Sequence, residues 1–251
     1  MERGKRMFKY LLVGVATVLF SVPVMAQNQA ATPPPKTYTG NFGAGLSVTG
    51  GNTDTKSFNL SFELTRDPKA KTVTKANGLY LRSSTDSITK TDTLRLGFRE
   101  DYFYTKRISL FGALGYLRDP FKDINYLLNP QGGVGVKVCS TDRTAFTLSA
   151  GAGGVWEKNP GIDVNSSGTI NAAEGYSYKI SDTAKLVQNW TAFWKTSNFD
   201  DALYHFDLSI VASIVKHIDV KLEFMDEYKN VVRSGIKKND TAVIISFLYK
   251  I

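Results

Sequence analysis

Apolar and polar side chains alternate along most of this chain. In the stretch "KSFNLSFELTR", apolar residues occupy every second position from Phe58 to Leu64, with polar residues between them. Side chains two positions apart share one face of an extended strand, so this stretch predicts a strand with one apolar and one polar face. The C-terminal stretch "TAVIISFLYKI" has the same period and a wholly apolar face made of Val243, Ile245, Phe247, Tyr249 and Ile251.

Twelve stretches of this kind follow one another, separated by turn-forming residues, and no sustained helical period occurs after residue 26. The pattern predicts an all-β domain. The expected strands cover residues 37–49, 56–66, 72–83, 92–104, 108–118, 124–138, 144–157, 172–180, 185–195, 202–214, 219–227 and 240–251.

The connections between these strands alternate in length. Short ones such as "TKR" and "SDTA" take turns with longer ones such as "STDSITKT" and "YKNVVRSGIKKN". Such alternation is typical of a transmembrane antiparallel up-and-down β-barrel, with short periplasmic turns and longer external loops. The apolar strand faces would then contact outer-membrane lipid, and closure of the barrel would leave no unpaired strand edge in the hydrocarbon. The alternative is a soluble periplasmic β-sandwich, in which a second sheet covers those faces.

The N-terminal segment predicts export. A basic start precedes the apolar stretch "LLVGVATVLF", and the small-residue site "VMA" ends at Ala26. These features predict a secretory signal peptide over residues 1–26, cleaved after Ala26, with an uncleaved anchor helix as the alternative. Residues 27–36 form a Pro-rich lead-in, and residues 37–251 form the barrel domain. We therefore expect the outer membrane of a Gram-negative bacterium as the location. Cys139 is the lone cysteine, so no internal disulfide stabilises the chain.

The basic character of the chain belongs largely to its leader. The whole sequence has a formal charge of +8, and removal of residues 1–26, with four basic residues and one acidic residue, lowers it to +5. No nucleic-acid-binding motif accompanies this small excess, so we expect no nucleic-acid partner.

Four stretches resemble a known family: "GNTDTKSFNLSFELTRD", "LYLRSSTD", "DPFKDINY" and "GAGGVWEKNP". The mature region is similar to the YdiY-like, salt-induced outer-membrane protein family, a group defined by a domain of unknown function. The resemblance implies an outer-membrane barrel and, through the family name alone, a link to salt or osmotic stress. It also implies insertion by the barrel assembly machinery, which recognises an aromatic residue at the end of the last strand. Here the chain ends on Ile251, with Tyr249 two positions earlier.

The polar faces of the predicted strands carry charges of both signs. We expect a charged cluster that faces the lumen, made of Glu63, Arg82, Arg95, Arg99, Asp101, Asp207, Lys221 and Glu223. One interpretation is a neutralising ion-pair network that plugs the lumen, because buried charges need partners. The other is a narrow channel whose arginines favour small anionic solutes. We expect a small passive channel or a structural component of the envelope.

The sequence offers little for catalysis. It has two histidines, and His205 shares a predicted strand face with Asp207 and Ser209. An outer-membrane lipid hydrolase would need a nucleophile within reach of a base such as His205. No nucleophile elbow, phosphate-binding loop or paired metal-binding histidines are present, so we expect no enzymatic activity, no cofactor and no catalytic metal.

One long loop has the spacing of a calcium-binding loop. In "DVNSSGTINAAE", Asp163, Asn165 and Ser167 occupy positions one, three and five, and Glu174 occupies position twelve. The flanking segments are predicted strands rather than helices, which favours an ordinary exposed loop over a calcium site.

Overall fold

The computed structural model describes residues 37–251 apart from 51–54, 69, 86–87, 233–234 and 236. The predicted signal peptide (residues 1–26) and the Pro-rich lead-in (27–36) lie outside the described residues. Among the described residues, no helix is long and apolar enough to cross a membrane.

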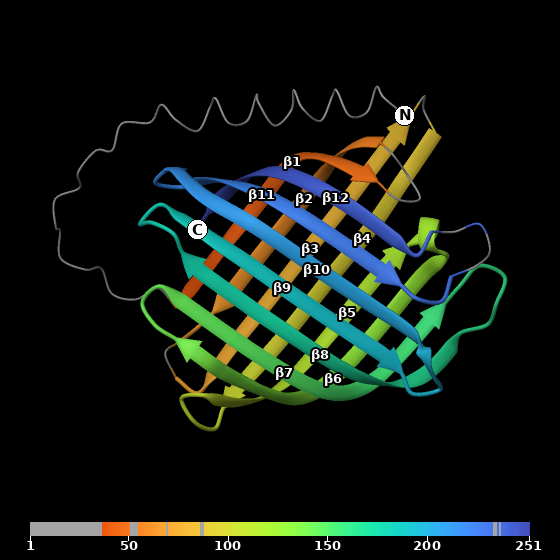
Figure 1. Cartoon of the computed structure of the whole chain (residues 1–251), viewed down its shortest axis with the longest axis horizontal. Coiled ribbons are helices and arrows are strands. Elements are labelled where there is room, and N and C mark those ends of the chain that lie inside the picture. Colours follow the sequence, from red (N-terminus) through yellow and green to blue (C-terminus); the bar gives the residue numbers. More distant parts are fainter. Residues whose placement is uncertain (1–36, 51–54, 69, 86–87, 233–234, 236) are drawn as a thin grey trace. The chain divides into compact units, whose positions relative to one another are not determined.

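The described chain forms a closed antiparallel barrel of twelve strands (Figure 1). Each strand pairs with the next along the chain, and the last strand pairs with the first through a continuous register from Asn41 opposite Lys250 to Gly50 opposite Thr241. The strands are β1 (Tyr38–Gly50), β2 (Thr55–Arg66), β3 (Thr72–Thr85), β4 (Ile88–Phe103), β5 (Ile108–Asp119), β6 (Ile124–Ser140), β7 (Thr144–Lys158), β8 (Asn165–Lys179), β9 (Ala184–Lys195), β10 (Asn198–Val215), β11 (Ile218–Lys229) and β12 (Asn239–Lys250).

The predicted fold class and strand number are confirmed. A single sheet that closes on itself excludes the β-sandwich, which needs two packed sheets. The side chains of Phe58, Phe98 and Phe247, which a second sheet would cover, are 44%, 49% and 61% exposed on the outer face.

The two ends of the barrel differ in their connections. At the end that we call the loop end, the longest connections cover residues 159–164 and 230–238. At the opposite end, here the turn end, the connections are residues 67–71, 104–107, 141–143, 180–183 and 216–217. The predicted asymmetry is present but smaller than expected, because β8 begins at Asn165 rather than at residue 172.

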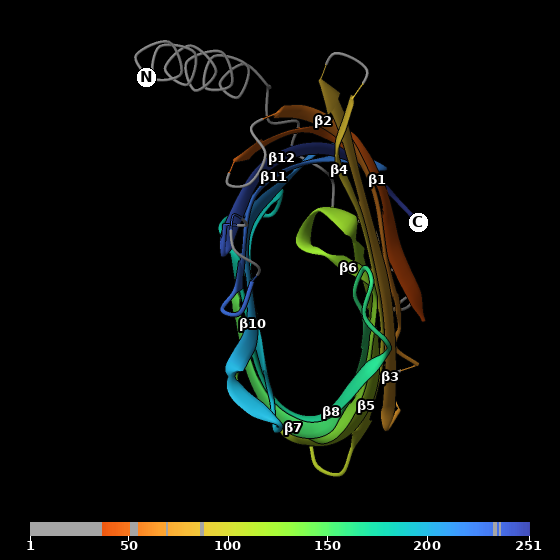
Figure 2. The same ribbon diagram turned by 90° about the vertical axis from the view of Figure 1, so that its right-hand side faces the viewer.

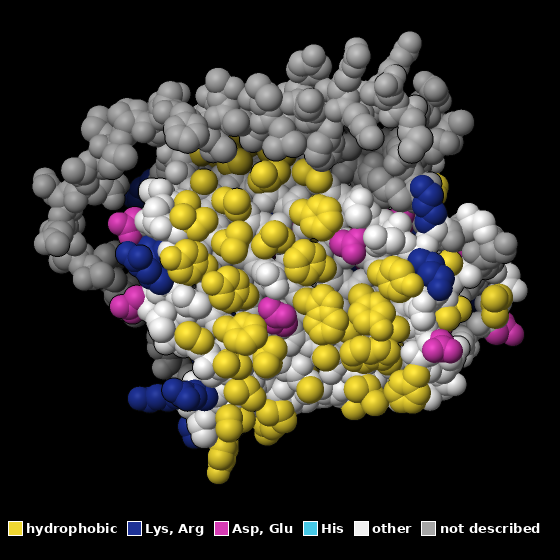
Figure 3. Space-filling view, in the orientation of Figure 1, with side chains coloured by type: hydrophobic (Ala, Val, Ile, Leu, Met, Phe, Trp, Pro, Cys, Tyr) yellow, Lys and Arg dark blue, Asp and Glu magenta, His cyan; other side chains and the backbone are white. Residues whose placement is uncertain are grey.

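The outer face is apolar over most of its area. Figure 3 shows hydrophobic side chains covering the face formed by the later strands, with few charges among them. Exposed aromatic residues lie toward both ends of the strands, such as Trp156 near the loop end and Tyr102 and Tyr249 near the turn end. Two aromatic girdles around an apolar band are typical of barrels that span the outer membrane.

The interior is oval rather than round in cross-section (Figure 2). One reason is the close approach of β12 to β2 across β1. The hydroxyl of Ser246 donates to Asn59 Oδ1 at 3.0 Å, directly over Gly45, which lies between them in the sheet. A Cβ at Gly45 would be 1.9 Å from the carbonyl oxygen of Ile245, so only glycine allows this sharp curvature.

Two apolar clusters connect facing walls of the barrel. In the first, Leu81 of β3 packs with Ala242 and Ile244 of β12. In the second, buried residues of β5, β6 and β7 pack against Phe193 of β9 and Leu203 of β10; these buried residues are Leu117, Ile124, Leu127 and Val155. Apolar contact across the barrel therefore fills part of its interior.

Candidate functional site in the barrel interior

The register shows which predicted lumen residues face the interior. Seven of the eight do: Glu63, Arg95, Arg99, Asp101, Asp207, Lys221 and Glu223. They do not form one cluster but are divided among separate groups along the barrel.

Arg82 was predicted to face the lumen, and this prediction is wrong. Its neighbours Leu81 and Ser83 are 3% and 4% exposed and point inward, so Arg82 points outward. The register places it beside Phe58 and Asp92 on the outer face. The stretch "GLYLRS" has three consecutive apolar residues, so its period alone does not distinguish the two faces.

A short helical turn after β5 enters the barrel at the loop end. This 3-10 turn, η1 (Pro120–Lys122), is capped by Asp119, whose Oδ1 accepts from the backbone N–H groups of Phe121 and Lys122 at 3.1 and 3.3 Å. Asp123 then adopts a left-handed conformation with φ of 59°, which returns the chain to β6. In Figure 2, η1 lies inside the outline of the barrel.

Lys122 links η1 to the opposite wall of the barrel. Its Nζ donates to Glu227 Oε1 of β11 at 2.9 Å and lies 3.5 Å from Asp240 Oδ2 of β12. The side chain of Lys122 is 3% exposed. Burial lowers the pKa of the Lys122 ammonium, an effect that the nearby carboxylates of Asp240 and Asp119 oppose. A segment between β5 and β6 is therefore fastened to β11 and β12 across the lumen.

Glu227 is the shared acceptor of this group. It also forms an ion pair with Arg95 of β4, and its Oε2 lies 3.9 Å from His205 Nδ1. His205 Nε2 in turn lies 3.6 Å from Asp207 Oδ2. We call this group the mouth cluster; it consists of Arg95, Asp119, Lys122, His205, Asp207, Glu227 and Asp240.

A second group lies at the same end of the barrel. Lys195 Nζ donates to Glu157 Oε2 at 2.5 Å and to Asp201 Oδ2 at 2.6 Å, and Lys229 Nζ donates to Glu157 Oε1 at 2.9 Å. Glu157 and Lys195 are 3% and 5% exposed. We call Glu157, Lys195, Asp201 and Lys229 the lysine cluster. Together with η1 and the apolar clusters, it fills much of the interior at the loop end with side chains.

Part of the interior at the turn end is open to solvent. Inward side chains on several strands are exposed there, including Lys75, Asn77, Thr147 and Lys185. A polar pocket of about 350 Å³ lies at this end, lined by residues 141–145, 177–179, 181–185, Val211, Ser213 and Asp219.

The predicted charges of this half are paired locally. Arg99 donates to both oxygens of Asp101 on its own strand, at 2.8 and 2.9 Å. Lys221 Nζ lies 2.6 Å from Glu223 Oε1 and 3.8 Å from Glu63 Oε1. The arginines expected to attract anions are therefore neutralised by neighbouring carboxylates.

Sequence reasoning missed several residues of the loop end. Lys122, Glu157, Lys195, Glu227, Lys229 and Asp240 all take part in ion pairs inside the barrel. For two of them the sequence contained a signal for an inward orientation. Glu157 lies two positions from the buried Val155, and Lys195 lies two positions from Phe193, so each pair shares one face of its strand. No pattern in the stretch "DPFKD" indicates that Lys122 points inward.

The calcium-loop hypothesis conflicts with the backbone. Asn165, Ser167 and Glu174 all belong to β8, which is extended rather than looped. Ser167 pairs with the inward Val155, whereas Glu174 pairs with Leu148 on the outer face and accepts a hydrogen bond from Gln188. Side chains on opposite faces of a strand cannot bind one ion. Among the described residues, no group of three or more potential ligands could hold a metal ion.

His205 and Ser209 do not form a nucleophile–base pair. They lie four residues apart on the extended strand β10, which separates them by about 13 Å. The contacts of His205 are instead the carboxylates of Asp207 and Glu227 in the mouth cluster.

The chain is similar in fold to proteins of the bacterial outer membrane. The NanC porin superposes with a TM-score of 0.57 at 8% identity, over 84% of this chain and 100% of that one. The translocator domain of the autotransporter NalP from Neisseria meningitidis gives 0.51 at 13% identity, over 98% and 95%. An outer membrane channel from Pseudomonas putida F1 gives 0.50 at 12% identity, over 90% and 100%.

A family model matches most of the sequence. It is described as "Protein of unknown function, DUF481" and covers residues 42–251. This match agrees with the resemblance drawn from the sequence motifs. No curated protein matches the chain.

Proposed function

The chain belongs to the DUF481 family of proteins of unknown function, and we propose that it is a small passive channel of the Gram-negative outer membrane, closed at the loop end in the conformation described above. The loop end would face outward and the turn end the periplasm, as in other outer-membrane barrels. The leader would direct export and be cleaved after Ala26, and insertion would depend on the barrel assembly machinery. A role in salt or osmotic stress stays a prediction.

The observation that carries the proposal is the position of η1 inside the lumen at the loop end (Figure 2). A plug that served only as packing would be expected to fill the mouth with apolar side chains, as in a protein core. Here η1 is held to the opposite wall by the contacts of Lys122 with Glu227 and Asp240. Polar contacts of this kind exchange with water at modest net cost, so η1 is suited to leave and return.

The open half suggests which solutes pass. Lys75 and Lys185 point inward and are exposed, whereas Arg95 and Arg99 are paired with carboxylates. We infer a weak preference for small anionic solutes that depends on these two lysines rather than on the arginines.

Single-channel recording in a planar bilayer tests the proposal. Wild type should conduct in brief openings, and Lys122→Ala should raise the open probability by about tenfold if one buried charged hydrogen bond holds the closed state. Lys158→Ala is the matched control, because Lys158 lies at the same end on the outer face, with its Nζ 4.0 Å from Asp163 Oδ1.

The opposite result would favour a structural role. If folded wild type and folded Lys122→Ala were both silent over the same voltage range, the interior would be a permanent plug. The apolar contacts between Leu81 and the β12 residues Ala242 and Ile244 favour this second candidate, because they join facing walls without water.

A further inference from the structure

Two arginines on the outer wall lie at the loop end, where a barrel would cross the outer surface of the membrane. Arg118, near the end of β5, donates through Nη2 to Asp92 Oδ2 of β4 at 3.0 Å. Asp92 is in register with Arg82 of β3, which is exposed on the same face. Three neighbouring strands thus place two guanidinium groups and one carboxylate together.

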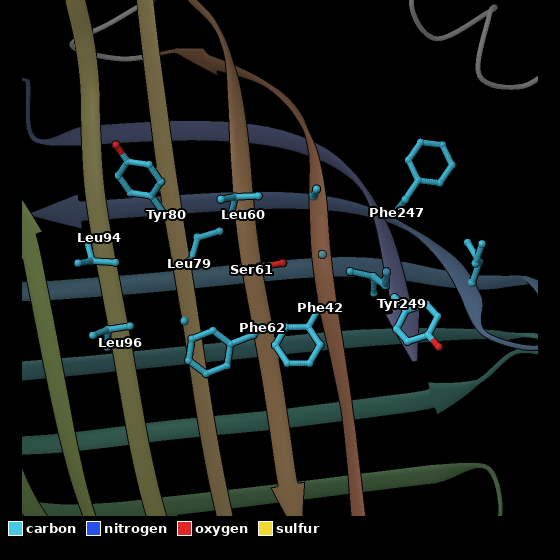
Figure 4. A pocket seen from close by; sticks show the side chains of 15 residues that line it. Phe42, Leu60, Ser61, Phe62, Leu79, Tyr80, Leu94, Leu96, Phe247 and Tyr249 are labelled. Atoms are coloured by element: carbon cyan, nitrogen blue, oxygen red, sulfur yellow. The ribbon is translucent and has the colours of Figure 1, made fainter. Parts of the chain in front are cut away.

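An apolar groove begins directly beside these charges. Tyr80 precedes Arg82 by two positions on the outer face of β3, and Leu94 is the register partner of both Tyr80 and Arg118. Tyr80 and Leu94 line a groove of about 620 Å³, together with outward residues of β1 and β2 such as Phe42, Leu60 and Phe62 (Figure 4).

Small residues give the groove its depth. Ala44 and Gly78 lie between the larger side chains, and the ring of Phe62 packs across Gly78, where a Cβ would lie 2.3 Å from a ring carbon. On the outer wall of a barrel such a groove faces the acyl chains, whereas the charged group at its end faces the level of the lipid headgroups.

We propose that Arg82 and Arg118 bind the phosphate of a phosphorylated outer-leaflet lipid, one of whose acyl chains lies in the groove beside Tyr80 and Leu94. Guanidinium groups match phosphate oxygens in geometry and charge, so two of them at the headgroup level suit the phosphate of a lipid. Asp92 holds Arg118 in place and leaves the group with a net charge of +1. The proposal rests on the outward orientation of the loop end given above.

Binding is measured with the full mature protein, folded in detergent micelles and titrated with lipid A, which carries two phosphates and several acyl chains. The readout is native mass spectrometry of the protein–lipid complex. Folding of each variant is verified by its far-ultraviolet circular dichroism. We expect Arg82→Ala combined with Arg118→Ala to weaken lipid A binding by about tenfold or more, the effect of one or two charged hydrogen bonds.

Three further sets of substitutions test whether the effect on lipid A binding is specific to this site. Lys106→Ala combined with Arg107→Ala removes two exposed charges at the turn end and should leave lipid A binding unchanged. Ala44→Phe should weaken binding by filling the groove while both arginines remain. Asp92→Asn should strengthen binding, because it removes the carboxylate that competes with phosphate for Arg118.

Several outcomes would overturn the proposal. Equal binding of lipid A by wild type and the double arginine variant would do so, as would equal binding of dephosphorylated lipid A by wild type. Displacement of lipid A by an equal concentration of inorganic phosphate would show that the groove contributes nothing. None of these results depends on conduction, so failure here is separate from failure of the channel proposal.

Discussion

The loop-end and turn-end halves of the barrel interior are built on the same strands but differ in what fills them. On β7, the inward side chain of Val155 near the loop end is 1% exposed, whereas that of Thr147 near the turn end is exposed. The loop end contains η1, the mouth cluster and the lysine cluster. The turn end contains short local ion pairs and a polar pocket. The comparison shows that the same twelve strands hold different side-chain groups at their two ends.

The difference arises from how charges are paired. At the loop end, partners come from distant strands, as when Lys122 of η1 reaches Glu227 of β11 and Lys229 of β11 reaches Glu157 of β7. At the turn end, the closest partners lie two residues apart on one strand, as with Arg99 and Asp101 or Lys221 and Glu223, and the contact of Lys221 with Glu63 of β2 is longer, at 3.8 Å.

Removal of Glu157 should have the largest effect on stability. Glu157→Ala removes the charged hydrogen bonds that Lys195 and Lys229 donate to Glu157, while Lys195 keeps its contact with Asp201, so the free energy of unfolding should fall by about 3 kcal/mol. Urea unfolding of the protein folded in lipid vesicles measures this. Asp163→Ala, which removes a fully exposed carboxylate at the same end, should leave the unfolding midpoint unchanged. Equal losses in the two variants would show that the lysine cluster is accessible to water.

The narrow edge of the oval should be nearly as sensitive. Gly45→Ala places a methyl group against the backbone of β12 and disturbs the bond between Ser246 and Asn59, so we expect a loss of about 1–3 kcal/mol. Gly112→Ala is the control, because a Cβ there meets no atom within 4 Å. The same unfolding assay compares the two variants. An unchanged free energy of unfolding in Gly45→Ala would mean that the two walls are free to move apart.

Charge reversal at the turn end should alter selectivity without altering stability. Lys75→Glu combined with Lys185→Glu should move the reversal potential, in a salt gradient across a planar bilayer, from weak anion preference to cation preference. Lys158→Glu on the outer wall should leave it unchanged. An identical reversal potential in the turn-end variant would place the selectivity elsewhere.

A calcium titration should give the smallest signal. Because β8 separates Ser167 from Glu174 on opposite faces, calorimetry with calcium should detect no heat in wild type or in Asp163→Ala. Binding that is lost in Asp163→Ala would require β8 to begin later than Asn165.

The sequence predicts the strands well because the outer face of the barrel is largely apolar (Figure 3) and the inner face largely polar, so that apolar and polar side chains alternate. The last strand is an example. Its alternate residues Val243, Ile245, Phe247 and Tyr249 point outward, whereas Ile244, Ser246 and Leu248 are buried inside. Alternation is uninformative where both faces are apolar, as at Arg82. It also fails in a polar strand, which explains why the first seven residues of β8 were predicted as a loop: their inward side chains face a polar lumen.

The interior is less predictable because contacts between facing walls depend on barrel curvature. Asp119 and Pro120 indicate a turn, but nothing local tells whether that turn lies outside the barrel or folds into it. Lys122 pairs with Glu227 and Asp240, which lie more than a hundred residues later in the sequence. The alternation in the sequence predicted correctly that seven charged residues face inward. How these residues are divided into groups could be seen only in the three-dimensional structure.

The difference between the two halves can be measured directly by thiol accessibility. In a Cys139→Ser background, Val155→Cys and Thr147→Cys place one thiol on the same strand, facing inward, in each half. The protein is folded in lipid vesicles, and a small membrane-impermeant thiol reagent is present on both sides of the bilayer. The reagent should label Thr147→Cys rapidly and Val155→Cys at least about a hundredfold more slowly. This ratio is expected if labelling of Val155→Cys requires an opening that costs roughly 3 kcal/mol. Labelling of both thiols at the same rate would contradict a closed loop end.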